Sequence, residues 1–78
     1  MIIDGDRNLK VKTHEGIHLI KIDDIFYFKS EVAYSNIFIK DEQVIIVCKQ
    51  FCEIEKYVRN YDFLRIHKSF LVNITLKK

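Results

Sequence analysis

Apolar and polar residues alternate with a period of two in short segments of this chain. Residues 9–13 follow this alternation, and residues 17–20 resume it after the turn-type segment His14-Glu15-Gly16. Such a pattern predicts two strands joined as a hairpin, with one face buried. The acidic pair Asp23-Asp24 interrupts the pattern, and the β-favouring run at residues 25–28 then predicts a third strand.

A second hairpin is predicted at residues 36–40 and 43–48, with Asp41 and Glu42 in its turn. The mostly polar residues 30–35 before it are expected to form a loop. The period changes once, because Phe51, Ile54 and Val58 stand at i, i+3 and i+7, which is one face of a helix at about residues 50–60. The fold class expected is therefore mainly β, with antiparallel strands and hairpins in small packed sheets and one short α-helix.

The core of this fold should hold the helix face and most of the aromatic side chains. In the strand predicted at residues 63–67, Arg65 and His67 are expected to share one side, opposite Leu64 and Ile66. If Leu64 and Ile66 are core, Arg65 and His67 face outward together. The aromatic residues expected in the core are Phe26, Phe28, Phe51, Phe63 and Phe70.

Length and composition indicate one small domain spanning residues 1–78. Hydrophobic residues make up 49% of the chain, as in a folded globular protein, and the formal net charge is only +2. The charge is unevenly placed, however. No acidic residue follows Asp62, whereas Arg65, Lys68, Lys77 and Lys78 do, and a local excess of one sign can steer a polyanion.

Several kinds of site are not supported by the sequence. His14 and His18 with Cys48 and Cys52 supply possible zinc ligands, but a turn and a strand would not bring the two histidines together. Neither a phosphate-binding glycine loop nor a recognisable catalytic group is present, so we expect no metal, no cofactor and no enzyme activity. The two cysteines are expected to be reduced and partly buried. Without an apolar run of membrane-spanning length, a cytoplasmic protein without membrane contact is expected.

The candidate binding residues lie in the segment Phe63-Leu64-Arg65-Ile66-His67-Lys68-Ser69-Phe70-Leu71-Val72-Asn73. Lys68 stands where one strand-like run passes into the next and can reach a guanine edge or a phosphate. The fork of Arg65 suits a phosphate, and Ser69 can donate to a phosphate or cap the following segment. Other roles remain open, since Arg65 can pair with Asp62 or a helix carboxylate and His67 can brace the loop. Asn73 is expected to hold backbone groups at a bend.

This segment resembles the signature of the LytTR family of bacterial DNA-binding domains, in which a Phe-x-Arg-x-His-basic-Ser-aromatic-x-Val-Asn run follows a short helix. The strand from Asp23 to Phe28 and the aromatic Tyr34 also match, so the likeness extends from about Leu9 to Asn73. It implies sequence-specific binding to duplex DNA through loops, as the output domain of a response regulator in a two-component system. The residues implied are Lys68, Arg65, Ser69 and His67, with Ser35 and Asn36 in a first contact loop.

The resemblance also implies partners. Domains of this family bind promoter direct repeats as dimers and follow a receiver or sensor domain, which would lie outside this chain. They run about a quarter longer, with two further strands after the Val-Asn pair, so this C-terminally short chain is expected to self-associate. The alternative is a small β-sheet protein-interaction or sensory module without DNA binding. That alternative predicts an exposed apolar patch and scattered cations, whereas DNA binding predicts Lys68, Arg65 and the Ser35–Asn36 loop on one face.

Overall fold

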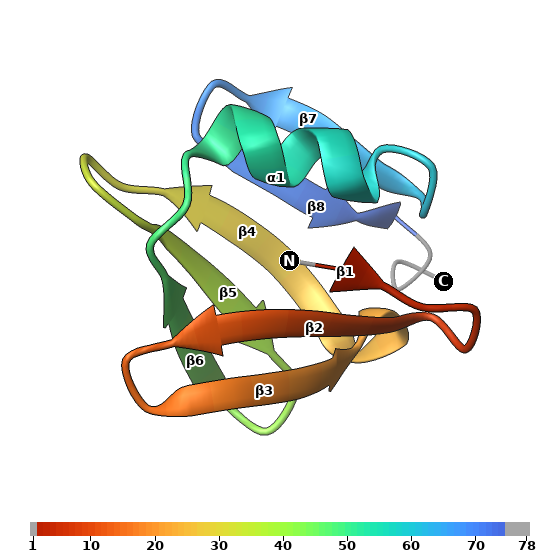
Figure 1. The fold of residues 1–78 in the computed structure, drawn as a ribbon. Helices are drawn as coiled ribbons and strands as arrows, with labels where there is room; N and C mark the ends of the chain where they lie inside the picture. Colours follow the sequence, from red (N-terminus) through yellow and green to blue (C-terminus); the bar gives the residue numbers. More distant parts are fainter. Residues whose placement is uncertain (1, 75–78) are drawn as a thin grey trace.

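The computed structural model describes residues 2–74 (Figure 1). Two antiparallel sheets hold the strands, in the orders β1-β2-β3 and β6-β5-β4-β8-β7, which confirms the expected mainly-β fold. The elements in chain order are β1 (Ile2–Ile3), β2 (Asn8–Thr13), β3 (Gly16–Lys21), a 3-10 turn (Ile22–Asp24), β4 (Ile25–Ser30), β5 (Ser35–Ile39), β6 (Gln43–Val47), α1 (Phe51–Val58), β7 (Phe63–His67) and β8 (Phe70–Asn73).

Both predicted hairpins are present, as β2–β3 and β5–β6, and the helix lies within the predicted range. Two details differ from the sequence analysis. The short edge strand β1 was not predicted, because two residues are too few to display a period. The polar segment 30–35 is mostly loop, but β4 runs to Ser30 and β5 begins at Ser35, so only residues 31–34 connect them.

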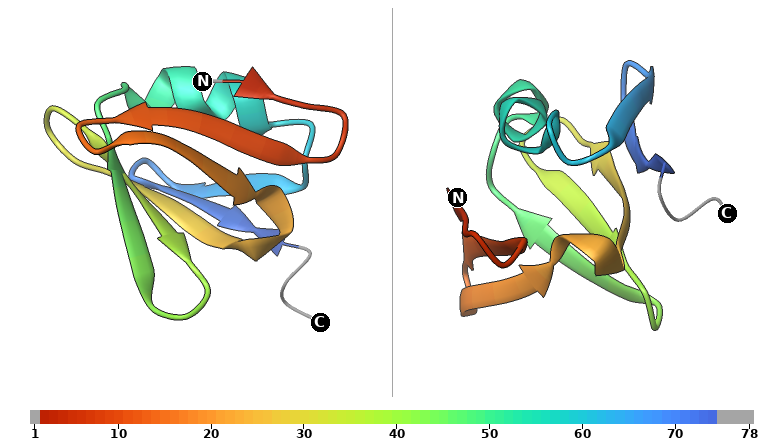
Figure 2. Two further views of the ribbon diagram at one scale, coloured as in Figure 1. Left: turned by 60° about the horizontal axis from the view of Figure 1, so that its bottom comes forward. Right: turned by 90° about the vertical axis from the view of Figure 1, so that its right-hand side faces the viewer.

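The three-stranded sheet and α1 cover the same face of the five-stranded sheet (Figures 1 and 2). Helix α1 turns its predicted face inward, since Phe51, Ile54 and Val58 are all buried. No helix within residues 2–74 is long and apolar enough to cross a membrane. The remaining buried apolar side chains form one cluster with this helix face: Leu9, Val11, Ile20, Ile22, Ile25, Phe28, Ile37, Ile39, Val47, Phe63 and Leu71.

Asn73 ties the end of β8 to the start of β4. Its buried Nδ2 donates to the carbonyl oxygens of Ile22, at 3.4 Å, and Ile25, at 3.0 Å. These carbonyls border the 3-10 turn that links the two sheets. Buried backbone carbonyls need such partners, so the structural role expected for Asn73 is confirmed.

Not every residue expected in the core is buried. Phe28, Phe51 and Phe63 are buried, but Phe26 is 45% exposed and Phe70 is half-buried, so the prediction was wrong for Phe26. A β-bulge between Ile25 and Tyr27 explains this difference, because an extra residue in a strand shifts the alternation of its side chains.

Candidate nucleic-acid interface

The tight turn between β7 and β8 carries Lys68 and Ser69 at its tip. Lys68 is exposed, and Ser69 is half-buried. Among the described residues, no hydrogen bond or ion pair involves the ammonium group of Lys68. That ammonium group is therefore available to a ligand.

A β-bulge lies directly before this turn. Arg65 is opposite Leu71 and His67 is opposite Phe70, which leaves Ile66 as the extra residue. Residues opposite one another in adjacent strands share a face of the sheet. Arg65 therefore lies on the face of the buried Leu71, whereas His67 lies with Phe70 on the other face.

The prediction that Arg65 and His67 lie on one side of β7 was consequently wrong, since the bulge changes the alternation between them. The condition for both to face outward is not met either, because Leu64 and Ile66 are 54% and 56% exposed and are not core residues. Strand β7 is one of the two edge strands of its sheet, and only Phe63 is buried within it.

Arg65 links α1 to the tip of the turn. One guanidinium nitrogen lies 3.0 Å from Oε1 of Glu55 in the helix, and the other donates to the carbonyl oxygen of Lys68 at 2.9 Å. The guanidinium carbon lies 5.3 Å from the centre of the Phe51 ring. The sequence left open whether Arg65 pairs with a helix carboxylate. In the structure it does, with Glu55.

His67 and Ser69 hold the turn from the other side. Nδ1 of His67 accepts a hydrogen bond from the backbone N–H of Ser69 at 3.1 Å, which is the bracing role considered for this histidine. The carbonyl oxygen of Ser69 accepts from the backbone N–H of Ser30 at 2.8 Å. The turn is therefore fixed to α1, to its own strand and to the end of β4.

The bond to Ser30 places the β4–β5 loop, residues 31–34, beside this turn, and both lie at the upper left in Figure 1. Val32 at the loop tip is fully exposed, and Tyr34 is 37% exposed. The sequence analysis named Tyr34 only as a match to the family, and it selected neither residue as a contact. The signal available was an apolar pair, Val32-Ala33, inside an otherwise polar connection.

Ser35 and Asn36 were predicted to lie in a contact loop. The structure places them instead at the start of β5. Ser35 is completely buried, and its Oγ donates to the carbonyl oxygen of Lys49 at 3.1 Å. Asn36 is half-buried and donates through Nδ2 to Oε2 of Glu31 at 3.3 Å. Ser35 therefore joins β5 to the segment before α1, and its hydroxyl faces away from solvent.

Most cations at this end of the molecule are paired with carboxylates. Lys29 lies 3.6 Å from Glu31, and Lys49 lies 3.6 Å from Glu53. With Arg65 paired to Glu55, Lys68 is the unpaired cation of the turn. Lys77 and Lys78, which extend the basic end in the sequence, lie outside the described residues.

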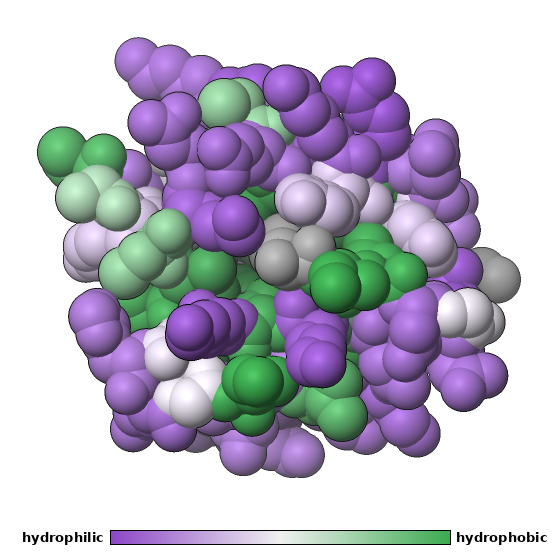
Figure 3. All heavy atoms as spheres, in the orientation of Figure 1, coloured by the Kyte–Doolittle hydropathy of each residue, from purple (hydrophilic) through white to green (hydrophobic). Residues whose placement is uncertain are grey.

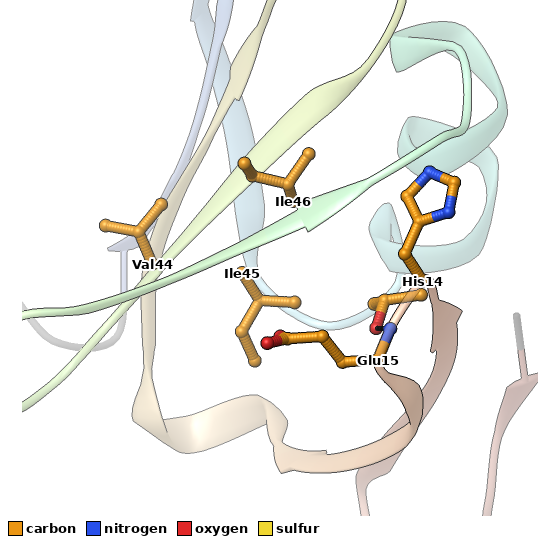
Figure 4. Close-up of a pocket in the computed structure, with 6 residues that line it drawn as sticks. His14, Glu15, Val44, Ile45 and Ile46 are labelled. Carbon is orange, nitrogen blue, oxygen red and sulfur yellow. Dashed lines mark hydrogen bonds between the residues drawn. The ribbon is translucent and has the colours of Figure 1, made fainter.

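The residues considered for metal binding do not assemble. Within residues 2–74, no three His, Cys, Asp or Glu side chains form a group that could hold a metal ion. Nε2 of His14 lies 3.7 Å from Sγ of Cys48, beside a shallow hollow between the β2–β3 turn and β6 (Figure 4). Both cysteines are free and exposed, so the prediction that they are partly buried was wrong.

The class defined by this fold is a β-sheet domain whose exposed turns, and not a helix, present the candidate contacts. A solved structure of this class is the LytTr DNA-binding domain from a Bacillus cereus protein described as a methyl-accepting/DNA response regulator. The two superimpose with a TM-score of 0.73 and 20% sequence identity, over 91% of this chain and 64% of that one. The chain thus spans less than two thirds of the length of this solved relative.

The LytTr DNA-binding domain family model matches residues 15–76, which is most of the chain. The chain therefore belongs to the LytTR family of DNA-binding domains, as its Phe-x-Arg-x-His segment indicated. The comparison with curated proteins gave no match.

Proposed function

We propose that this domain binds duplex DNA sequence-specifically through its β7–β8 turn and the adjacent β4–β5 loop. The observation that carries the proposal is the unpaired, exposed Lys68 at the tip of a turn fixed by three hydrogen bonds. A lysine held at a rigid tip can enter the major groove and reach O6 and N7 of guanine. Membership of a DNA-binding family supports the same reading.

The other candidate residues take different roles in this proposal. Arg65 and His67 position the turn. The hydroxyl group of Ser69 donates a hydrogen bond to a phosphate. Asn36 borders the contact surface, whereas buried Ser35 supports the loop from within. Exposed Val32 adds apolar surface that suits a thymine methyl group.

We further propose the setting of this activity. The domain acts in the cytoplasm of a bacterium as the output part of a transcription regulator, without enzyme activity of its own. It binds direct repeats in a promoter, and a receiver or sensor domain outside residues 1–78 controls it. A protein that pairs two DNA-binding turns doubles the contacts with duplex DNA and so gains affinity and site length.

The experiment that tests DNA readout is Lys68→Ala, measured by titration with a selected duplex and with unrelated duplexes over a salt series. If Lys68 reads a base, the variant loses about 1–3 kcal/mol of preference for the selected site. Its binding to unrelated DNA stays nearly constant. If Lys68 meets only a phosphate, affinity falls about equally on every duplex and the salt slope drops by about one.

Lys40 supplies the control. It lies at the opposite end of β5 from the loop, is 56% exposed and pairs with Asp24 at 3.4 Å. Lys40→Ala removes the same charge and should leave both site preference and salt slope unchanged. Equal losses from Lys40→Ala and Lys68→Ala would refute a localised site, because net charge alone would then govern binding.

The alternative function, a protein-interaction module, is favoured by one specific observation. Apolar side chains that include Val44, Ile46 and Leu64 are about half exposed on the strands of the five-stranded sheet. The two functions use different surfaces and are compatible. A chain that binds no duplex even at low salt would leave protein interaction as its function.

A further inference from the structure

Three lysines and three exposed apolar side chains share one face of the three-stranded sheet. Residues directly opposite one another in adjacent strands lie on the same face, and so do residues two apart within a strand. The pairing of β1, β2 and β3 therefore gathers on one side, which we call the basic face, Ile2, Lys10, Lys12, Ile17, Leu19 and Lys21. Each apolar side chain of the basic face lies directly opposite a lysine.

The basic face points to solvent. Leu9, Val11 and Ile20, which alternate with its members along β2 and β3, are buried in the core. Ile17 and Leu19, at 63% and 69%, are among the most exposed large apolar side chains of the described residues. Figure 3 shows apolar and polar side chains intermixed over β2 and β3. No element within residues 2–74 covers this surface.

The lysines of the basic face have no carboxylate partner within the described part of the chain. None of the five ion pairs among residues 2–74 involves Lys10, Lys12 or Lys21. Strands β2 and β3 themselves contain no acidic residue. The ammonium groups are therefore available to an anionic ligand.

The acidic residues in the turns beside this sheet are mostly engaged elsewhere. Oδ1 of Asp4 accepts two backbone N–H groups of its own loop, which also carries Asp6. Asp23 and Asp24 in the 3-10 turn are each paired with a cation outside the basic face. The side chain of Glu15 lies beside β6 (Figure 4). The basic face consequently keeps a local excess of positive charge, although the whole chain is nearly neutral.

The apolar part of the basic face is large enough to contribute to binding. Ile2, Ile17 and Leu19, at 61–69% exposure, present on the order of 350 Å² of apolar surface, within the range of the largest patch on an ordinary monomer. The lysine stems add apolar area while their ammonium groups stay in water. The sheet fixes the side chains at about 4.8 Å between strands and about 7 Å within a strand, so a partner meets a preorganised pattern.

We propose that the basic face binds an acidic segment of a partner protein. Apolar side chains of the segment lie on Ile17 and Leu19, and its carboxylates pair with Lys10, Lys12 and Lys21. Complementary charge selects partners of the opposite sign and speeds their association, while burial of the apolar groups adds affinity. This interaction goes beyond the proposed DNA binding and uses the other sheet of the domain.

Other polyanions fit the basic face less well. Contact with duplex DNA would press three apolar side chains against a charged backbone that offers them no apolar partner. Binding to an anionic membrane requires a continuous apolar surface that enters the lipid, whereas here a lysine lies directly opposite each apolar side chain. A protein surface can supply carboxylates and apolar groups side by side.

The test uses a synthetic peptide of three Glu-Ser-Leu-Ser repeats, which presents glutamate and leucine alternately on one side when extended. It is titrated at low salt into the 78-residue chain labelled with nitrogen-15, and NMR follows the amide shifts. We expect saturable binding with a Kd below about 1 mM and shifts concentrated on β2 and β3. A peptide of three Lys-Ser-Leu-Ser repeats has the same apolar content and should not bind.

Two pairs of variants locate the contact. Lys12→Glu should weaken peptide binding at least about fivefold, because it replaces an attraction by a repulsion. Lys56→Glu, on an exposed residue of α1 that also lacks an ion pair within residues 2–74, should leave the Kd unchanged. Leu19→Ala should weaken binding about threefold, whereas Leu64→Ala in the other sheet should not. Circular dichroism verifies that all four variants are folded.

Three results would overturn the proposal. The first is the absence of saturable binding of the acidic peptide at 1 mM. The second is equal weakening by Lys12→Glu and Lys56→Glu, which would indicate net charge instead of a defined face. The third is a Lys12→Glu variant that keeps peptide binding but loses affinity for duplex DNA or for phosphatidylserine vesicles. Failure of the DNA site is distinguishable, because Lys68→Ala should leave peptide binding unchanged.

Discussion

Arg65 supports the β7–β8 turn, the candidate binding turn, from the face of the strand that lies toward α1. Its guanidinium joins the Glu55 carboxylate, the Lys68 carbonyl oxygen and the Phe51 ring. These contacts use the flat, forked shape of arginine, which lysine lacks. With one nitrogen on Glu55 and the other on the turn, Arg65 is a positioning residue in the proposed DNA site.

This role predicts a distinctive response to substitution. Arg65→Ala and Arg65→Lys should both weaken binding to the selected duplex, because each loses the hydrogen bond to the turn. The expected loss is about 1–2 kcal/mol. Since Arg65 touches no phosphate in this role, the salt slope should stay unchanged in Arg65→Lys. Titration over a salt series measures both quantities. Full affinity in Arg65→Lys would show that Arg65 contributes only its positive charge and does not position the turn.

The sequence could not place Arg65 and His67 correctly. Alternation predicts that residues two apart share a face, and this holds along β2, where Leu9 and Val11 are both buried. One extra residue at Ile66 reverses the rule in β7. A bulge depends on the turn and on the partner strand, so local composition does not reveal it.

At the scale of elements, α1 is the part that the sequence specifies best. Three apolar positions on one stripe suffice to locate the helix within residues 50–60 and to identify its buried face, although the helix itself is shorter, Phe51–Val58. The two hairpins were equally readable, because each joins alternating strands through turn-forming residues. The order β6-β5-β4-β8-β7 was not predictable, since it depends on contacts between distant segments such as β4 and β8.

The helix supports both the core and the turn, so shortening a buried side chain on its inner face should lower the stability of the domain. Ile54 has no exposed surface, and Ile54→Ala should lower the free energy of unfolding by about 2–4 kcal/mol. Urea denaturation followed by circular dichroism measures this loss. The exposed neighbour Cys52 on the same helix is the control, and Cys52→Ala should change stability by less than about 0.5 kcal/mol. Similar losses in both variants would contradict the assigned core face.

At the scale of the whole molecule, the two sheets differ in what they bury. The three-stranded sheet and α1 cover one side of the five-stranded sheet, and no element within residues 2–74 covers the other side. Because a chain of 78 residues buries a smaller share of its surface than a larger domain does, its stability is expected to be modest.

The support of the β7–β8 turn has a consequence for how this domain can change its target. Arg65, His67 and Ser30 hold the backbone of the turn, while the Lys68 side chain contributes no hydrogen bond or ion pair to the described fold. Position 68 can therefore be exchanged without loss of stability. Selection can act on this one side chain to retarget the domain, and a library of substitutions at Lys68 should yield folded variants that differ in the DNA they prefer.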